Sequence, residues 1–353
     1  MKIIRDILSS GTDYLSARGV DAPRFSMQSL LTHVLGCDRT WLYLHYEDPV
    51  DEEKLSVLRE LLRRRGRGEP LQHLLGSTEF YRREFRTDAR ALIPRPETEE
   101  LATLVLQRTA RRRGLRVLDM GCGSGVLGIT LALELAPLEP EVVLADVSPA
   151  ALSLTLENAT ALGARVRTYA SDLFSAWRAE EGSDRLIPPS PFDLVVANLP
   201  YVPDGEPLAA EVQHDPALAL YGGPDGLDVV RRFLDEARPY LAPGALVMLE
   251  VGHDQGDAVR RLMEELGYER CDLLCDLSGK ARFPLGYAAA SFTAPAEEQK
   301  DSAQDGEEDE GDEGAGNGGD APETPAEEAH GSAALSTAAP APSDDSPQPH
   351  PAR

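Results

Sequence analysis

Apolar residues recur at spacings of three and four along the first 75 residues of the chain, which is the pattern of amphipathic helices. The pattern is clearest at 4–20, 25–36 and 51–68. Gly36, Gly66 and Gly68 suit the ends of these runs, because glycine adopts the left-handed backbone conformation at little steric cost. Residues 1–75 are therefore predicted to form a small helical bundle.

Residues 76–96 have a different pattern, with two short strand-like runs followed by two prolines. Glu97, Glu99 and Glu100 come directly after Pro96. The first turn of a helix favours both proline and negative charge. The segment is therefore predicted to be a β-hairpin connector that leads into a helix.

Residues 97–290 alternate between strand-like apolar runs and longer runs with helical spacing. Strands are predicted at 116–121, 141–148, 165–174, 191–201 and 244–252, helices at 125–136, 149–163, 226–242 and 256–267, and the stretches 268–279 and 284–292 close the domain. Such alternation predicts an α/β fold with a mostly parallel sheet and helices on both faces. Ligands of such sheets bind outside the carboxyl ends of the strands, so the candidate site lies there.

Residues 291–353 are rich in Ala, Pro, Gly and Ser and contain 16 acidic residues against two basic ones. This tail carries about 14 of the 25 net negative charges of the 353-residue chain. It cannot bury enough apolar surface to offset the entropy lost on folding, so it is predicted to be disordered.

The body of the chain is only mildly acidic and contains two arginine clusters. They are Arg59, Arg63, Arg64, Arg65 and Arg67, and Arg111, Arg112 and Arg113. A solvated helix face is favoured over a contact with nucleic acid or the ribosome.

The four cysteines are too few and too irregularly spaced for a disulfide scaffold. Cys271 and Cys275 have no second Cys or His pair nearby, so no metal site is expected. The N-terminus lacks the apolar region of a signal peptide, and no run of about 18 apolar residues occurs later. A soluble, cytoplasmic protein is the expectation.

A glycine-rich sequence, "LDMGCGSG" at 118–125, ends the first predicted strand of the sheet. Three alternating glycines follow Asp119: Gly121, Gly123 and Gly125. Glycines let the backbone approach a ligand where side chains would clash. The stretch 123–128 also matches the fingerprint G-x-G-x-x-G, and Asp146 follows about 20 residues later, where it could bind ribose hydroxyls. A nicotinamide dinucleotide is therefore a legitimate alternative ligand.

A third acidic residue, Asp172, ends the next predicted strand in "ASDLF". With Asp119, the glycines and Asp146, it completes an ordered set on successive strand ends. This set resembles a Rossmann-type S-adenosylmethionine site, and the resemblance implies that Asp119 lies by the amino-acid part of the cofactor and Asp172 by the adenine edge. Each carboxylate alone is more often a capping or solvent-facing group, so only the ordered set favours this cofactor.

The fourth predicted strand of the sheet ends in Asn198-Leu199-Pro200-Tyr201. An amide nitrogen is a poor nucleophile because its lone pair is shared with the carbonyl. Two convergent acceptors, the Asn198 side-chain oxygen and the Leu199 carbonyl, could hold both N–H groups of a substrate amide and free that lone pair. Pro200 would fix the direction of the carbonyl, and Tyr201 could pack on the planar amide. A plain strand followed by a proline turn is the alternative, and the upstream glycine motif favours the amide clamp.

The sequence from 68 to 101 resembles the signature of the protein-(glutamine-N5) methyltransferases that modify class-1 peptide chain release factors. The likeness continues through "VLDMGCGSGVLGI", "SDLF", "NLPYV", "ALYGGPDGLD", "LEVGHDQG" and "DLSGKARFPLGY", and covers residues 1 to about 287. It implies a Rossmann-type methyltransferase domain, a release-factor-contacting bundle, and methyl transfer to the glutamine of a Gly-Gly-Gln loop. The implied cofactor residues are Asp119, Gly121, Cys122, Gly123, Ser124, Gly125, Asp146, Asp172, Leu173 and Asn198, and the implied catalytic and substrate residues are Asn198, Leu199, Pro200 and Tyr201.

The sequence departs from the family pattern at two positions, and only the first of them keeps another function open. Leu199 stands where the family usually has proline, and the resulting Asn-Leu-Pro-Tyr also occurs in enzymes that methylate adenine N6 in RNA. Asp215-Pro216 stands where the family tends to have Glu-Pro. An adenine N6-methyltransferase acting on RNA or DNA is one alternative, and a non-enzymatic cofactor-binding scaffold on the translation machinery is another.

Overall fold

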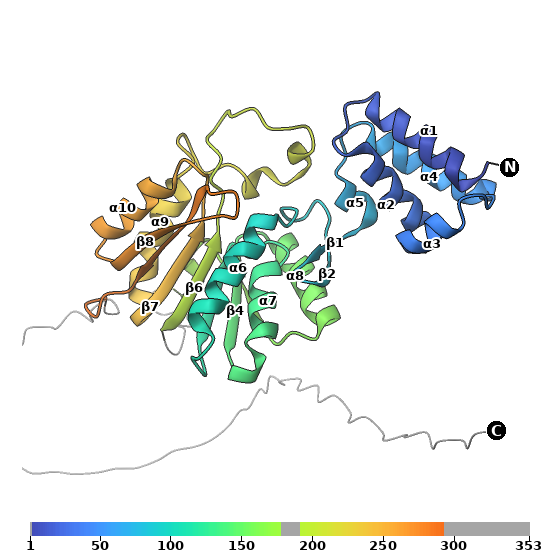
Figure 1. The fold of residues 1–353 in the computed structure, drawn as a ribbon. Coiled ribbons are helices and arrows are strands. Elements are labelled where there is room, and N and C mark those ends of the chain that lie inside the picture. The colour runs from blue at the N-terminus through green and yellow to red at the C-terminus, as the bar shows by residue number, and fades with distance from the viewer. Residues whose placement is uncertain (1, 178–190, 293–353) are drawn as a thin grey trace, which may run out of the picture. The chain divides into compact units, whose positions relative to one another are not determined.

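The computed structural model describes residues 2–177 and 191–292, and the tail predicted to be disordered lies almost entirely outside them. The first segment is helical (Figure 1), with α1 at Ile4–Ser16, α2 at Pro23–Leu35 and α4 at Glu52–Arg65. Two short helices, α3 at Arg39–Leu44 and α5 at Leu71–Leu75, were not predicted. Each spans fewer than two turns, so neither displays the periodicity that the prediction relied on.

The helices at 4–75 bury a core of their own. Its most deeply buried members are Ile4, Leu15, Met27, Leu30, Leu31 and Leu42. Helix packing is close at Gly11, where a β-carbon would lie 2.2 Å from the sulfur of Met27. Asp38 and Asp51 cap α3 and α4 by accepting from the backbone N–H groups three residues later.

A two-stranded hairpin follows the helices, with β1 at Ser77–Phe80 paired antiparallel to β2 at Arg83–Arg86. Tyr81 and Arg82 both have positive φ, as the tight turn of a hairpin demands. Helix α6 then begins at Pro96 and ends at Thr109, so proline occupies its first position as predicted.

The central sheet has seven strands in the order β5-β4-β3-β6-β7-β9-β8. The strands are β3 at Arg116–Met120, β4 at Glu141–Asp146, β5 at Arg167–Ala170, β6 at Phe192–Asn198, β7 at Leu241–Glu250, β8 at Glu269–Cys275 and β9 at Ala281–Tyr287. The pairs from β5 to β7 are parallel, and β9 runs antiparallel to both its neighbours. The predicted α/β class with a mostly parallel sheet is confirmed.

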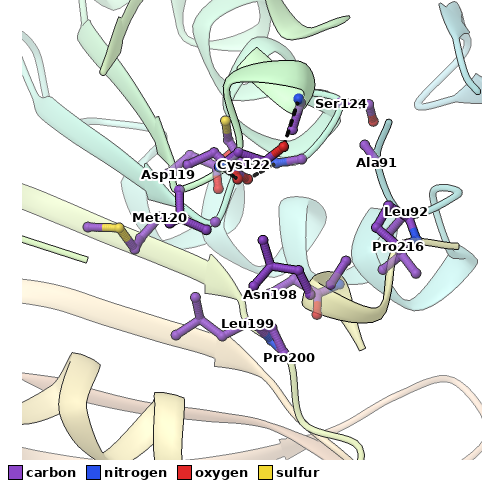
Figure 2. A pocket seen from close by; sticks show the side chains of 18 of the residues that line it. Ala91, Leu92, Asp119, Met120, Cys122, Ser124, Asn198, Leu199, Pro200 and Pro216 are labelled. Carbon is purple, nitrogen blue, oxygen red and sulfur yellow. Dashed lines mark hydrogen bonds between the residues drawn. The ribbon is translucent and has the colours of Figure 1, made fainter. Parts of the chain in front are cut away.

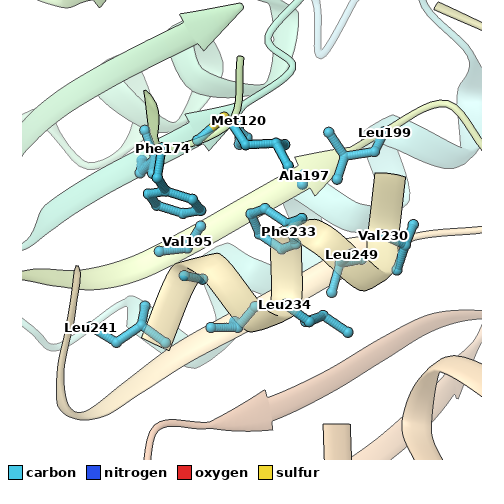
Figure 3. Close-up of a cluster of buried hydrophobic side chains, with 14 of the residues drawn as sticks. Met120, Phe174, Val195, Ala197, Leu199, Val230, Phe233, Leu234, Leu241 and Leu249 are labelled. Atoms are coloured by element: carbon cyan, nitrogen blue, oxygen red, sulfur yellow. The ribbon is translucent and has the colours of Figure 1, made fainter. Parts of the chain in front are cut away.

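Helices cover both faces of this sheet (Figure 1): α6, α7 (Val126–Glu134) and α8 (Pro149–Leu162) on one, α9 (Asp228–Ala237) and α10 (Gly256–Glu265) on the other. Alternate residues of each strand enter opposite cores, because successive side chains of a strand point to opposite faces. In β6, Val195 and Ala197 meet Phe233 and Leu234 of α9 (Figure 3). Their neighbours Leu194 and Val196 join the core beneath α6 and α7.

This alternation decides where the polar strand ends point. Asp119, Asp146, Asn198 and Glu250 each lie two residues after a side chain of the α6–α8 core, such as Val196 before Asn198. All four therefore lie on the same face of the sheet, at the carboxyl ends of adjacent strands.

Most arginines of the two predicted clusters form ion pairs. The pairs are Arg59–Glu52, Arg63–Glu60, Arg64–Glu69, Arg65–Glu211, Arg112–Asp193 and Arg113–Glu139. These carboxylates offset much of the positive charge, and Arg65, which is buried, does not lie on a solvated face. Within the described residues, no helix is both long and apolar enough to cross a membrane.

Candidate functional site

A cavity of about 390 Å³ lies at the carboxyl ends of β3, β4 and β6. Figure 2 shows Cys122 and Ser124 on one side of it, with Asn198 and Leu199 opposite and Pro216 nearby. It brings together Asp119, Gly121, Cys122, Gly123, Ser124, Asp146, Asp172, Leu173, Asn198, Leu199 and Pro200. Gly125 and Tyr201, which the sequence also pointed to, are not among its lining residues.

The glycine loop turns sharply between β3 and α7. Gly121, Gly123 and Gly125 all have positive φ, a conformation that is costly for residues with a β-carbon. A β-carbon on Gly121 would lie 2.9 Å from Cδ2 of Leu199, so this glycine lets the loop pack against the end of β6. Gly125 is needed for a different reason, because its β-carbon would meet Ile129 and Thr155 in the protein interior. It therefore shapes the loop from behind rather than facing the cavity.

Two residues of α8 that sequence reasoning missed hold the loop from behind. The Thr155 hydroxyl donates to the Gly123 carbonyl at 2.8 Å, and the Asn158 side chain donates to the Ser124 carbonyl at 2.9 Å. Asn158 also binds both backbone groups of Arg86 in the hairpin. The sequence signal was weak, since Thr and Asn in a helix usually face solvent.

Asp119 lies beneath the loop rather than in front of it. Its carboxylate accepts from the backbone N–H of Gly128 at 2.8 Å, at the start of α7, and only 1% of the residue is exposed. Burial raises the pKa of Asp119 to about 7, against the opposing effect of this hydrogen bond. Asp119 thus lines the cavity and also ties the strand end to the helix.

Asp146 is bound to the loop by both carboxylate oxygens. Oδ2 accepts from the N–H of Gly123 at 2.9 Å, and Oδ1 accepts from the N–H of Ser148 at 2.8 Å. Burial raises the pKa of Asp146, and these backbone donors oppose the rise. A carboxylate oxygen can accept more than one hydrogen bond, so the group retains capacity toward a ligand in the cavity.

The predicted pair Asp172-Leu173 lies at the far end of the cavity. The Asp172 carboxylate pairs with Arg232 of α9 at 3.1 Å. Leu173 has φ of 49°, a strained value for a leucine, and its side chain is buried. Arg232 also lines the cavity and is a residue that sequence reasoning did not single out.

Asn198 is held by two residues that sequence reasoning also missed. Its side-chain nitrogen donates to the Thr98 hydroxyl at 3.1 Å, and that hydroxyl donates to Oε2 of Glu250 at 2.7 Å. With the nitrogen engaged, the side-chain oxygen of Asn198 remains as an acceptor. The Leu199 side chain is buried in the core beneath α9 (Figure 3), so little rotational freedom remains for the backbone that follows.

Tyr201 lies just past the cavity. Its carbonyl accepts from the Gln255 side chain at 2.9 Å, and Gln255 in turn accepts from the N–H of Gly252 after β7. Burial raises the pKa of Tyr201 to about 12, and the Glu250 carboxyl adds to the rise. Gln255 lies within "LEVGHDQG", and its role depends on a contact 54 residues away in sequence.

The described residues contain no cluster of three or more His, Cys, Asp or Glu side chains able to hold a metal ion. The cavity instead offers backbone groups, carboxylates and an amide around largely apolar walls. This is a set suited to a flat, polar small molecule.

Comparisons with known proteins match both halves of the described chain. The family model for the PrmC N-terminal domain matches residues 6–76, and the one for the methyltransferase small domain matches residues 98–210. The release factor glutamine methyltransferase of Deinococcus radiodurans is 37% identical over 282 residues, which is 79% of this chain and 96% of that protein. Proteins of the same name from Geobacter sulfurreducens and Bordetella pertussis are each 37% identical, over 78% and 75% of this chain and 93% and 95% of theirs.

Proposed function

Because the chain belongs to the family of release factor glutamine methyltransferases, we propose that it methylates the glutamine of the Gly-Gly-Gln loop in class-1 peptide chain release factors. The methyl group comes from S-adenosylmethionine and goes to the side-chain amide nitrogen (N5). The helical bundle at 1–75 is proposed to contact the release factor, and the cytoplasm is the proposed location because release factors act on ribosomes.

The residues that line the cavity support a proposed position for each part of S-adenosylmethionine. When bound, this cofactor supplies an electrophilic methyl group on a sulfonium sulfur. Asp146 would accept from the ribose hydroxyls, and Asp172 and Leu173 would face the adenine. The loop from Gly121 to Ser124 would lie against the amino-acid part, where the absence of β-carbons on two glycines leaves room. The family membership favours this cofactor over a nicotinamide dinucleotide.

The reaction requires the protein to activate a weak nucleophile, the side-chain amide nitrogen of the substrate glutamine. Amide resonance delocalises the nitrogen lone pair into the carbonyl, so the amide nitrogen is a weak nucleophile. Two acceptors that bind both N–H groups increase the electron density on nitrogen and hold the substrate in line. With the cofactor bound, attack by this nitrogen on the methyl carbon would break the sulfur–carbon bond, and the nitrogen would then lose a proton to solvent.

Asn198 and Leu199 are the proposed acceptors. The Asn198 nitrogen is engaged by Thr98, so its oxygen is the end available to the substrate. The Leu199 carbonyl has a restricted direction, because its side chain is buried and Pro200 follows it with a fixed φ. Tyr201 is proposed to pack on the amide plane once the glutamine enters past the cavity.

The observation that carries this proposal is the meeting of Asn198, Leu199 and Pro200 with the glycine loop and Asp146 around one cavity. A cofactor-binding scaffold would have no use for an amide acceptor at that position. The shared name of the relatives also favours glutamine over adenine as the methyl acceptor.

The test is to incubate the purified chain with S-adenosylmethionine labelled in the methyl group, and with either a class-1 release factor or ribosomal RNA. Label is expected in the release factor, at the glutamine of the Gly-Gly-Gln loop, and not in the RNA. Replacing that glutamine by glutamate in the release factor is the matched control and should abolish incorporation. Label in adenine of the RNA instead would overturn the proposal.

A further inference from the structure

Three side chains from three elements meet beside the cavity. Asn198 ends β6 and Glu250 ends β7, and the two are paired in register on adjacent parallel strands. Thr98, in the first turn of α6, lies between their side chains, 3.1 Å from the Asn198 nitrogen and 2.7 Å from Glu250 Oε2. Thr98 is 4% exposed and Glu250 is 1% exposed, so water does not substitute for either contact.

The hydrogen-bond inventory of these groups fixes the orientation of the amide. An ionised carboxylate can only accept, so the single hydroxyl proton of Thr98 goes to Glu250. The Thr98 oxygen can then only accept from Asn198. This places the NH₂ end of Asn198 toward Thr98 and leaves the carbonyl end for the cavity.

A protonated carboxyl would remove this constraint. Glu250 could then donate to Thr98, and Thr98 could donate to the carbonyl end of Asn198. The amide would turn by half a rotation and present its NH₂ group to the cavity. The NH₂ group of Asn198 and the N–H of the substrate amide would then face each other, and neither can accept a hydrogen bond from the other.

We propose that Glu250 and Thr98 are positioning residues that set which end of the Asn198 amide faces the substrate. The inference rests on the proposed function of Asn198 as an acceptor for the glutamine amide. In addition, two consecutive hydrogen bonds, from Asn198 to Thr98 and from Thr98 to the buried Glu250 of the neighbouring strand, hold this acceptor. These three residues are called the relay below.

Charged groups from several elements surround Glu250. They are Glu97 on α6, Arg95 just before α6 and Arg282 on β9, and the neutral hydroxyl of Tyr201 after β6 lies near them. Burial raises the pKa of Glu250 to about 7, the Thr98 hydrogen bond opposes the rise, and the Glu97 carboxylate adds to it. The relay therefore changes its protonation state near neutral pH.

The two arginines do little to reverse this rise, because each is engaged elsewhere. Arg282 pairs with Asp276 at 2.8 Å, and Arg95 pairs with Asp215 at 2.7 Å. Methyl transfer is accordingly expected to increase as the pH rises through about 7, when Glu250 becomes ionised.

The first experiment compares threonine variants of the full chain by steady-state kinetics with a release factor. Thr98→Val should lower kcat by about 10- to 100-fold while KM and cofactor affinity change by less than about threefold. Thr98→Ser restores the hydroxyl and should recover most of kcat. Thr109→Val is the matched control, because Thr109 is equally buried in the same helix but its hydroxyl donates to the carbonyl of Val105.

The second experiment addresses the carboxyl directly. Glu250→Gln keeps the shape but can both donate and accept, so it should lower kcat by about tenfold at about pH 8. It should also abolish the increase in kcat between about pH 6 and about pH 8. In an Asn198→Ala background, Thr98→Val should cause no further loss, since Thr98 acts through Asn198.

The outcomes separate the inference from the function it rests on. Wild-type kcat and an unchanged pH profile in Thr98→Val and Glu250→Gln, with Asn198→Ala impaired, would overturn the positioning role alone. Full activity of Asn198→Ala would overturn the proposed role of Asn198 and the relay with it.

Discussion

The carboxylate of Asp215 is fully buried and accepts a hydrogen bond from Arg95 at 2.7 Å. It also accepts from the backbone N–H of Ile93 at 3.2 Å. These contacts attach the segment that follows the Asn-Leu-Pro-Tyr motif to the segment that precedes α6. Arg95 lines the cavity, and so does Pro216, the residue after Asp215. The contact between Asp215 and Arg95 therefore lies at one edge of the site.

Replacing Asp215 by Ala should therefore destabilise this edge. The substitution leaves the Ile93 N–H without its partner, and we expect it to lower the free energy of unfolding by about 1–3 kcal/mol. Urea denaturation measures this, with Asp215→Glu as the control because it retains the charge and restores the residue usual in the family. An unchanged unfolding midpoint in Asp215→Ala would show that the ion pair does not hold the segment.

Asp146 should contribute to cofactor affinity both directly and through the loop. In Asp146→Ala the N–H groups of Gly123 and Ser148 lose their acceptor, and the ribose hydroxyls would lose the acceptor proposed for them. We expect S-adenosylmethionine binding to weaken by about 1–3 kcal/mol, measured by isothermal titration calorimetry. Wild-type affinity in this variant would remove Asp146 from the proposed cofactor site.

Leu199→Pro should separate the backbone role of this position from its packing role. Proline keeps the carbonyl and restores the family's usual residue, so methylation should stay within about tenfold of wild type, provided that Asn198 accepts the extended conformation. The buried Leu199 side chain is lost from the core, which should cost on the order of 1–2 kcal/mol of stability. Activity lost in a variant that stays folded would mean that the leucine itself takes part in alignment.

The acidic tail can be tested by truncation, and the structure indicates where to cut. Phe292 packs edge-on against Tyr268, with ring centroids 5.1 Å apart, so the chain should end after it. A protein ending at Phe292 is expected to keep the methylation rate and the thermal midpoint of the full chain, because the removed segment has little apolar content. A protein ending at residue 290 should melt at a lower temperature. A large fall in turnover in the protein that ends at Phe292 would instead give the tail a direct role.

Hydrophobic periodicity and turn chemistry were enough to predict the five parallel strands, their flanking helices and the strand ends that carry Asp119, Asp146 and Asn198. They did not assign β8 and β9 as strands. The features that were predicted are local in sequence. Thr98 and Glu250 could not be found in that way, because their roles depend on a contact that spans 152 residues. The same holds for Asn158, whose partners in the hairpin lie 72 residues away.

Gly125 and Tyr201 belong to the two motifs but are not among the residues that line the cavity. The spacing of the motif placed Gly125 with the other loop glycines, but a β-carbon at this position would meet Ile129 and Thr155. Tyr201 follows Pro200 in the motif, and its carbonyl accepts from Gln255, while the packing of its ring on the substrate amide stays a prediction. A sequence motif shows which residues belong together, but the path of the backbone decides which of their side chains line the cavity.

The amide clamp itself is tested most directly by single-turnover methylation of a release-factor domain by Asn198→Ala, with cofactor affinity measured alongside. The substitution removes one acceptor and leaves the glycine loop, Asp119 and Asp146 in place. The rate of methyl transfer should fall on the order of 10²-fold or more, while most of the cofactor affinity is kept. Methylation by Asn198→Ala at the wild-type rate would contradict the clamp.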